Sequence, residues 1–202
     1  ACGGTAPLRQ RGCRTRFWLT GIAIGLMAAV ALALLLSGRG DRGIAATASF
    51  HPPVPAPVID LPYTIRIGTE GARLRLLNGW SGDEQSPEGP FAWADGEGSG
   101  ISFRLEQPQA LLLTMRCYPF TFPGSPAQTL AVWVNGVPVS EYTLAPAERE
   151  YTATVPAPVL VAGANRLEFR YAYARVVRDV VPESTDERSL SVAWRTITLA
   201  AA

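Results

Sequence analysis

The chain has 202 residues, enough for one domain of ordinary size with accessory segments but too few for two well-packed domains. All 18 basic residues are Arg, and in the C-terminal region they are scattered among acidic residues without a basic stripe, which excludes nucleic acid as an expected partner. The net charge of +1 hides an asymmetry, because residues 1–16 carry four Arg and no acid, whereas residues 60–202 hold 12 Arg against 16 acidic residues. Such a difference is typical of a protein with its two ends in different compartments.

An Arg-rich tail, residues 1–16, precedes an uncharged apolar run, residues 17–37. As a helix this run is roughly 30 Å long, one hydrocarbon thickness, and it is too long for the apolar part of a signal peptide. The Arg excess before it predicts a cytoplasmic N-terminus and an extracytoplasmic C-terminal region. Of the three cysteines, only Cys117 then lies on the outer side, so no intramolecular disulfide is expected and Cys117 is interpreted as a buried apolar thiol.

Small residues recur every fourth position along the predicted transmembrane helix: Gly21, Gly25, Ala29 and Ala33. On a helix they form one ridge, which lets a second backbone approach closely. The ridge predicts packing against another transmembrane helix, so other transmembrane subunits are expected partners besides membrane lipid.

A linker is predicted over residues 38–62, first rich in glycine and then rich in proline. The glycine part should flex, and the proline part should act as an extended spacer. His51, the only histidine, lies in this spacer and is interpreted as a solvated side chain.

Residues 63–202 show short alternating runs separated by Gly, Pro, Asn and Asp, which predicts an all-β sandwich. Two runs alternate clearly and should each place one apolar face in the core: Ile101, Phe103 and Leu105, and Leu167, Phe169 and Tyr171. Residues 130–134 are apolar in both phases, which predicts a strand that is buried on both faces.

Asn135-Gly136 follows this strand and predicts a tight hairpin, because both residues tolerate positive φ. Pro138 indicates that the return strand lies at a sheet edge. The last run, residues 190–199, changes phase between Trp194 and Ile197, which predicts a β-bulge.

Several short motifs resemble those of jelly-roll modules appended to bacterial membrane glycosyltransferases and envelope proteins, modules similar in fold to carbohydrate-binding modules. The motifs are Gly79-Trp80-Ser81 with Glu84, Trp93-Ala94-Asp95-Gly96, Val134-Asn135-Gly136 and Asp186-Glu187-Arg188-Ser189-Leu190. The resemblance implies a jelly-roll sandwich on the outer side of a bacterial cytoplasmic membrane, periplasmic or extracellular, and supports fold more than function. This chain has no glycosyltransferase domain, and Ser191 stands where the motif usually has Gly.

The residues needed for catalysis are sparse. The predicted domain lacks a histidine, a G-x-S-x-G motif and a C-x-x-C motif, so we expect neither enzymatic activity nor a cofactor. An acidic stretch offers hard oxygen ligands, and its Ca²⁺ candidates are Asp83, Glu84, Asp95 and Glu97. Their spacing matches no calcium loop, so a solvated loop with Arg partners is the favoured interpretation.

Aromatic residues near strand ends offer flat surfaces for sugar rings, although such residues more often fill a sandwich core. Six aromatic residues could supply such a surface: Trp80, Trp93, Tyr118, Phe120, Phe122 and Trp133. Trp80, Trp93, Phe120 and Phe122 are the candidate ligand-binding residues, and prolines place Phe120 and Phe122 in a predicted exposed loop.

Two functions are compatible with these features. The first is a non-catalytic single-span accessory subunit of a larger membrane complex, energy-converting or envelope-building, with its sandwich packed on the extracytoplasmic face. The alternative is a membrane-tethered carbohydrate-binding module whose partner is a glycan. Exposed aromatics beside a groove would favour the glycan, and a broad apolar patch with buried tryptophans would favour the complex.

Overall fold

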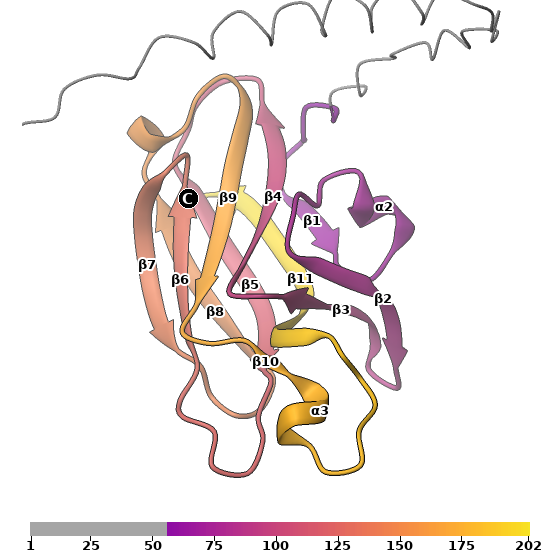
Figure 1. Cartoon of the computed structure of the whole chain (residues 1–202). Coiled ribbons are helices and arrows are strands. Elements are labelled where there is room, and N and C mark those ends of the chain that lie inside the picture. The colour runs from indigo at the N-terminus through magenta and orange to yellow at the C-terminus, as the bar shows by residue number, and fades with distance from the viewer. Residues whose placement is uncertain (1–55) are drawn as a thin grey trace, which may run out of the picture. The chain divides into compact units, whose positions relative to one another are not determined.

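The computed structural model describes residues 56–202, which form two antiparallel β-sheets packed face to face (Figure 1). The first sheet has the order β3-β11-β5-β8, with bounds Gly89–Asp95, Ser189–Ala201, Leu111–Pro119 and Arg149–Val155. The second has the order β4-β9-β6-β7, with bounds Gly98–Leu105, Gly163–Tyr171, Thr129–Val134 and Val137–Thr143.

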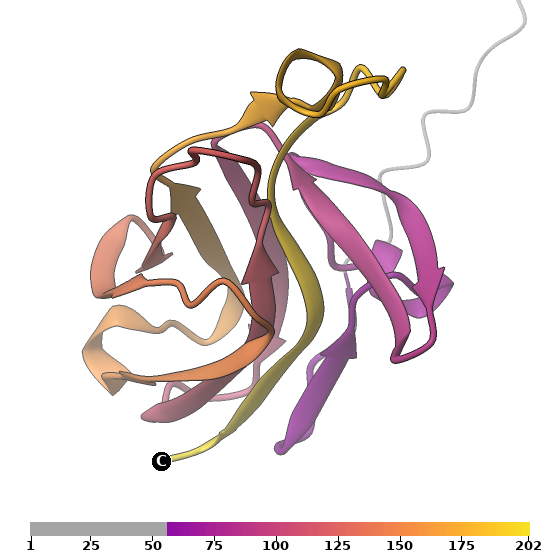
Figure 2. The ribbon, with the colours of Figure 1, turned by 90° about the horizontal axis from the view of Figure 1, so that it is seen from below.

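Shorter elements extend the first sheet. Strands β1 (Tyr63–Arg66) and β10 (Arg175–Val176) pair with β11, and β2 (Trp80–Ser86) pairs with β3. Figure 2 shows β11 running along the domain with the purple N-terminal strands on one side of it. The helical elements are short: α2 (Glu70–Arg73), η1 (Ala157–Val159) and α3 (Val177–Val180). Within residues 56–202, no helix has the length and apolar character needed to cross a membrane.

The strand order is that of a jelly roll. Among the eight strands of the two four-stranded sets, successive strands pass from one sheet to the other, except for the β6–β7 hairpin, so each set is assembled from strands distant in sequence. Eight strands in two interleaved four-stranded sets define this architecture, and the predicted all-β jelly-roll sandwich is confirmed.

The predicted alternation is confirmed in β4 and β9. Their inward side chains are buried against the opposite sheet: Ile101, Phe103, Leu105, Leu167, Phe169 and Tyr171. The outward positions between them remain accessible to solvent, apart from Gly100. The second sheet therefore has one apolar face and one free face.

The prediction for residues 130–134 was wrong on one face. Leu130, Val132 and Val134 are buried, but Ala131 and Trp133 on the other phase are only partly covered. Because no third layer packs on this sheet, the ring of Trp133 lies on its outer face. Apolar residues at both the inward and the outward positions of this strand therefore indicated an aromatic residue on the surface, and not a strand buried on both faces.

The hairpin and the edge strand are confirmed. Asn135 and Gly136 have φ values of 50° and 80°, and β7, which carries Pro138, forms an edge of the second sheet. The Asn135 side chain also donates to the carbonyl of Val159 at 2.8 Å, so the hairpin tip is held to the β8–β9 connection.

The bulge in β11 is confirmed. Its register against β5 shifts between Trp194 and Thr196, so Trp194 points into the core and Arg195 occupies the irregular position.

The folded region begins before Tyr63, inside the segment expected to be linker. Ile59 is buried in the core and donates its backbone N–H to the carbonyl of Arg104 at 2.9 Å. The predicted tail, transmembrane helix and small-residue ridge, Gly21, Gly25, Ala29 and Ala33, lie outside the described residues.

Cys117 is a buried apolar thiol, as predicted. Burial, with a smaller contribution from the negative charge of Glu148, raises the pKa of this thiol to about 12. The group is therefore neutral and unreactive at physiological pH.

Candidate functional site

Trp80, a candidate ligand-binding residue, packs at the margin of the core. Its ring meets that of Trp194 edge to face at 6.1 Å, and its indole N–H donates to the carbonyl of Gly100 at 2.8 Å. The ring and the polar end of Trp80 thus both make contacts within the fold, and the side chain is partly buried against the core.

Trp93, Phe120 and Phe122 are brought together, in an aromatic cluster on the outer side of the first sheet. Two ring pairs meet nearly at right angles, 88° for Trp93 with Phe120 and 80° for Phe122 with Tyr173, whereas the rings of Phe120 and Phe122 are inclined at 43°. Phe120 is 9% exposed and packs with Val177 and Leu190. Trp93 and Phe122 are partly buried against Phe120, so the cluster is a small second core rather than an open platform.

The acidic candidates are not brought to one site. Asp83 pairs with Arg73, Glu84 pairs with Arg188 at 2.6 Å, and Asp95 accepts a backbone N–H from Ser189. No group of three metal-ligating side chains occurs between residues 56 and 202. Asp83 and Glu84, which have these Arg partners, lie in strand β2 rather than in a loop.

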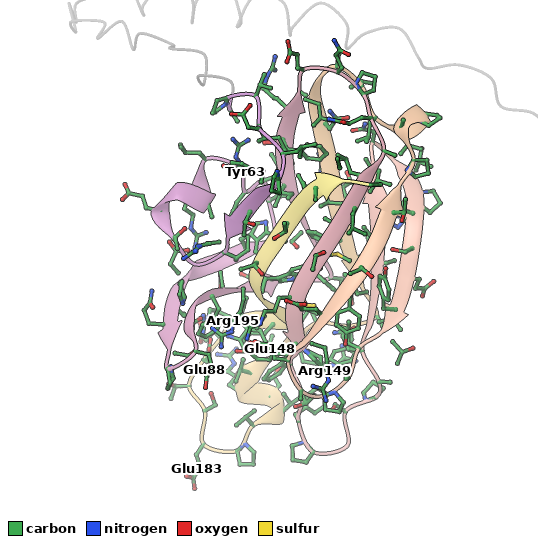
Figure 3. All side chains as sticks on the ribbon, turned by 180° about the vertical axis from the view of Figure 1, so that it is seen from behind. Tyr63, Glu88, Glu148, Arg149, Glu183 and Arg195 are labelled. Carbon is green, nitrogen blue, oxygen red and sulfur yellow. The ribbon has the colours of Figure 1, made fainter. Side chains whose placement is uncertain are left out.

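A network of polar side chains centred on Arg195 lies on the outer side of the first sheet (Figure 3). Arg195, only 6% exposed, donates to a carboxylate oxygen of Glu148, to the carbonyl of Gly89 at 2.9 Å and to the hydroxyl of Ser86 at 3.0 Å. Hydrogen bonds from Ser86 and from its own backbone lower the pKa of Glu88, which also faces Arg195. These groups satisfy one another, and we interpret them as structural.

A different site lies on the free face of the second sheet. A hollow of about 290 Å³ opens there, which we call the sheet-face groove. Its lining comes from β4, from β9 and from the segment before β2: Asn78, Gly98, Ser99, Arg166, Glu168, Phe169 and Arg170. On the far side stands Trp133, which pairs with Glu168 across β6 and β9.

Local backbone geometry builds the near wall of the groove. Leu77 donates its N–H to the carbonyl of Gly100 at 2.9 Å, and Gly100 donates to that of Asn78 at 3.2 Å, so this segment extends the sheet beyond β4. Gly79 turns the chain with a φ of 82°, and a Cβ there would lie 2.0 Å from the carbonyl oxygen of Gly98. Only glycine permits this approach, which sets Asn78 beside the groove.

The floor of the groove is low because Gly98 faces outward. Its φ is not in the positive range, so the backbone does not require glycine there. A Cβ would meet only the carbonyl of Phe169, at 3.3 Å. The missing side chain therefore contributes open space between Asn78 and the charged row on β9.

The charged row has two cations and one anion. Arg166 and Arg170 both pair with Glu168, the second at 3.6 Å, and the Arg166 guanidinium also reaches the Asn78 side-chain oxygen at 3.5 Å. The guanidinium carbon of Arg170 lies 4.0 Å from the centre of the Trp133 ring. Both Arg side chains are more than half exposed, whereas Glu168 is 22% exposed.

Sequence reasoning named Trp133 as an aromatic residue but missed the groove around it. The available signals were an apolar residue in the outward phase of β6 and a glycine in the outward phase of β4. The charged residues of β9 carried no such signal, because alternating charge on a strand indicates only a solvated face.

The comparisons with known proteins give structural similarities alone. No family model and no curated protein matches this sequence. A ruminal GH26 endo-β-1,4-mannanase is similar with a TM-score of 0.45 and 15% identity, covering 73% of this chain and 27% of that one. The C-terminal CBM6 of LamC, a marine laminarinase from Zobellia galactanivorans, has a TM-score of 0.41 and 13% identity, covering 68% of this chain and 98% of that module.

A carbohydrate-binding module CBM36 in complex with calcium and xylotriose has a TM-score of 0.39 and 10% identity, covering 68% of this chain and 99% of that module. The chain thus spans about a quarter of the mannanase and nearly the whole of either module. The strand order itself defines the class of the domain as a jelly-roll sandwich.

Proposed function

We propose that this chain is a non-catalytic, membrane-tethered carbohydrate-binding module of the bacterial cell envelope. The observation that carries the proposal is the sheet-face groove, with Trp133 on one side, Asn78 on the other and Gly98 in its floor. Binding sites for small ligands are concave and combine an apolar surface with a few converging polar groups, and this groove does so on an otherwise free sheet face.

The dimensions and chemistry of the groove suit a short oligosaccharide. From Asn78 across β4 and β9 to Trp133 there are three strand spacings, about 14 Å at the usual separation. Sugar rings pack their C–H faces on aromatic rings, and their hydroxyls both donate and accept hydrogen bonds. The indole ring of Trp133 can meet a sugar C–H face. The Asn78 amide both donates and accepts hydrogen bonds, the guanidinium groups donate, and the Glu168 carboxylate accepts.

The membrane tether is supported by the sequence. Residues 17–37 are long enough to span, and the Arg excess lies before them, which favours an extracytoplasmic sandwich. In that position the groove faces the glycans of the envelope.

Removal of the Trp133 ring tests the proposal. The full chain in mild detergent should retain members of an array of envelope and plant oligosaccharides, and Trp133→Leu should lose at least tenfold in affinity for them. Asn78→Ala should weaken binding less, because it removes one hydrogen-bonding group.

Two control variants match these changes. Tyr118→Leu removes a half-buried ring from the outer face of the other sheet, and Gln109→Ala removes an amide from a loop outside the groove. Both should bind like wild type. Equal affinity of Trp133→Leu and wild type, or no retention of any glycan, would contradict the proposed function.

A second candidate, an accessory subunit of a membrane complex, rests on the small-residue ridge in the sequence. Gly25→Leu adds bulk to the ridge without adding charge, so it should reduce recovery of partner helices in mild detergent and leave the sandwich folded. Leu34→Ala, off the ridge, is the control. Unchanged recovery of the same partners by Gly25→Leu would remove the basis for this candidate.

A further inference from the structure

Arg170 occupies the ring face on which a sugar would pack. Its guanidinium carbon stands 4.0 Å from the centre of the Trp133 ring, a cation–π contact. Its ion pair with Glu168 is long, 3.6 Å, and Glu168 also pairs closely with Arg166. Arg170 is thus held by two modest contacts and is 55% exposed, so it can turn away from the ring.

The groove carries a net positive charge. Two guanidinium groups of β9 share one carboxylate, and Asn78, the polar side chain on the opposite wall, is neutral. Further out on the same face, Arg104 on β4 and Glu141 on β7 have opposite charges and offset each other. The balance of these groups leaves about one uncompensated cation at the groove.

Resting on the proposed glycan function, we propose that the sheet-face groove selects sugars that carry an anionic substituent, a carboxylate or a sulfate ester, and that Arg170 is the specificity-determining residue. A neutral sugar that packs on Trp133 displaces the Arg170 guanidinium without offering it a charge. An anionic sugar offers Arg170 a charge-assisted hydrogen bond, roughly twice as strong as a neutral one. The same ligand therefore frees the ring face and satisfies the displaced cation.

Because of Glu168, the groove should not bind every anion through charge alone. It remains paired with Arg166, whose guanidinium also contacts Asn78, so one cation stays neutralised while Arg170 moves. A small inorganic anion cannot cover the indole ring, and only a ligand with both a ring face and a charge uses Trp133 and Arg170 together.

Calorimetry of the full chain in mild detergent, with matched glycan pairs, tests the proposal. The pairs are oligogalacturonate with its methyl ester, and κ-carrageenan oligosaccharides with their desulfated form. At least one charged member should bind about tenfold more tightly than its neutral partner, and the difference should shrink at high salt, where exposed charges are screened.

Arg170→Gln should abolish the preference while leaving binding of the neutral member equal or stronger, because the ring face is then unblocked. Arg170→Lys, which keeps the charge but not the planar fork, should retain part of the preference. Arg104→Gln, a change on the same face outside the groove lining, should leave the preference intact.

The outcomes separate this inference from the proposed function. If neutral glycans bind through Trp133 and neither charged member is preferred, the selectivity is overturned and the glycan function stands. If the preference survives in Arg170→Gln, Arg170 is not its source and the inference fails. Absence of glycan binding altogether would overturn both.

Discussion

Trp133 and Phe120 show how the fold assigns opposite roles to similar side chains. Phe120 follows β5 and turns under α3, where Val177 and Leu190 cover it. Trp133 lies within β6, on a sheet face that no other element covers, and only Arg170 contacts its ring as a cation. Whether an aromatic residue serves the core or a ligand thus depends on what lies above its sheet, which strand periodicity does not encode.

Cys117 offers a pH-dependent test at the same scale. Because burial raises the pKa of its thiol to about 12, the reactive thiolate should be nearly absent at pH 8. We expect iodoacetamide to leave Cys117 unmodified in the native chain at pH 8 and to label it rapidly in concentrated guanidinium, as measured by mass spectrometry of its peptide. Labelling of the native chain at the denatured rate would show that the thiol is accessible.

At the scale of elements, β11 organises the first sheet. It pairs with β5 and β10 along one edge and with β1 and β3 along the other. The bulge after Trp194 lets the strand bury an indole and then direct Arg195 toward the β2–β3 turn and Glu148. One irregular residue thereby joins three segments that are distant in sequence.

Loss of the Arg195 guanidinium should therefore weaken the fold. Arg195→Met leaves Glu148 without its buried partner and frees the β2–β3 turn, so we expect the free energy of unfolding to fall by about 3 kcal/mol, measured with denaturant. Hydrogen exchange in residues 86–89 should also become faster.

Arg116→Met is the matched control, because Arg116 pairs with the same carboxylate but is 45% exposed. It should lower stability by about 1 kcal/mol or less. Equal effects of the two variants would show that burial of Arg195 adds nothing to its contribution.

On the scale of the whole molecule, the chain joins the sandwich at the end that carries the β4–β5 and β8–β9 connections (Figure 1). The groove lies on a side of the sandwich, on the outer face of β4 and β9, rather than at this end. The first described residues therefore do not cover the proposed binding face.

The proposed topology predicts an asymmetric response to protease. Protease added to the outer side of intact spheroplasts should cut within residues 38–55 and release the sandwich, while an epitope fused before residue 1 stays protected. Inverted vesicles, in which the cytoplasmic side is exposed, serve as the control and should lose the epitope instead. Protection of the sandwich in spheroplasts would reverse the assignment.

Local patterns in the sequence were enough to predict the sandwich class, the Asn135-Gly136 hairpin, the edge position of β7 and the β11 bulge. Each of these follows from alternation or from the φ preferences of one or two residues, which neighbours along the chain determine. The jelly-roll likeness came from short motifs, and the strand order confirms it.

The tertiary structure alone decided where the binding surface lies. The sheet-face groove brings together Asn78, Gly98 and Arg170, and Trp133 stands beside it. The crossing of strands between sheets makes these segments neighbours. Contacts between residues far apart in the chain decide which sheet face stays uncovered. They also decide that the Arg170 guanidinium lies over the Trp133 ring. Periodicity describes a strand against an average environment, so it places Trp133 on the outward side of β6 but cannot place Arg170 above it.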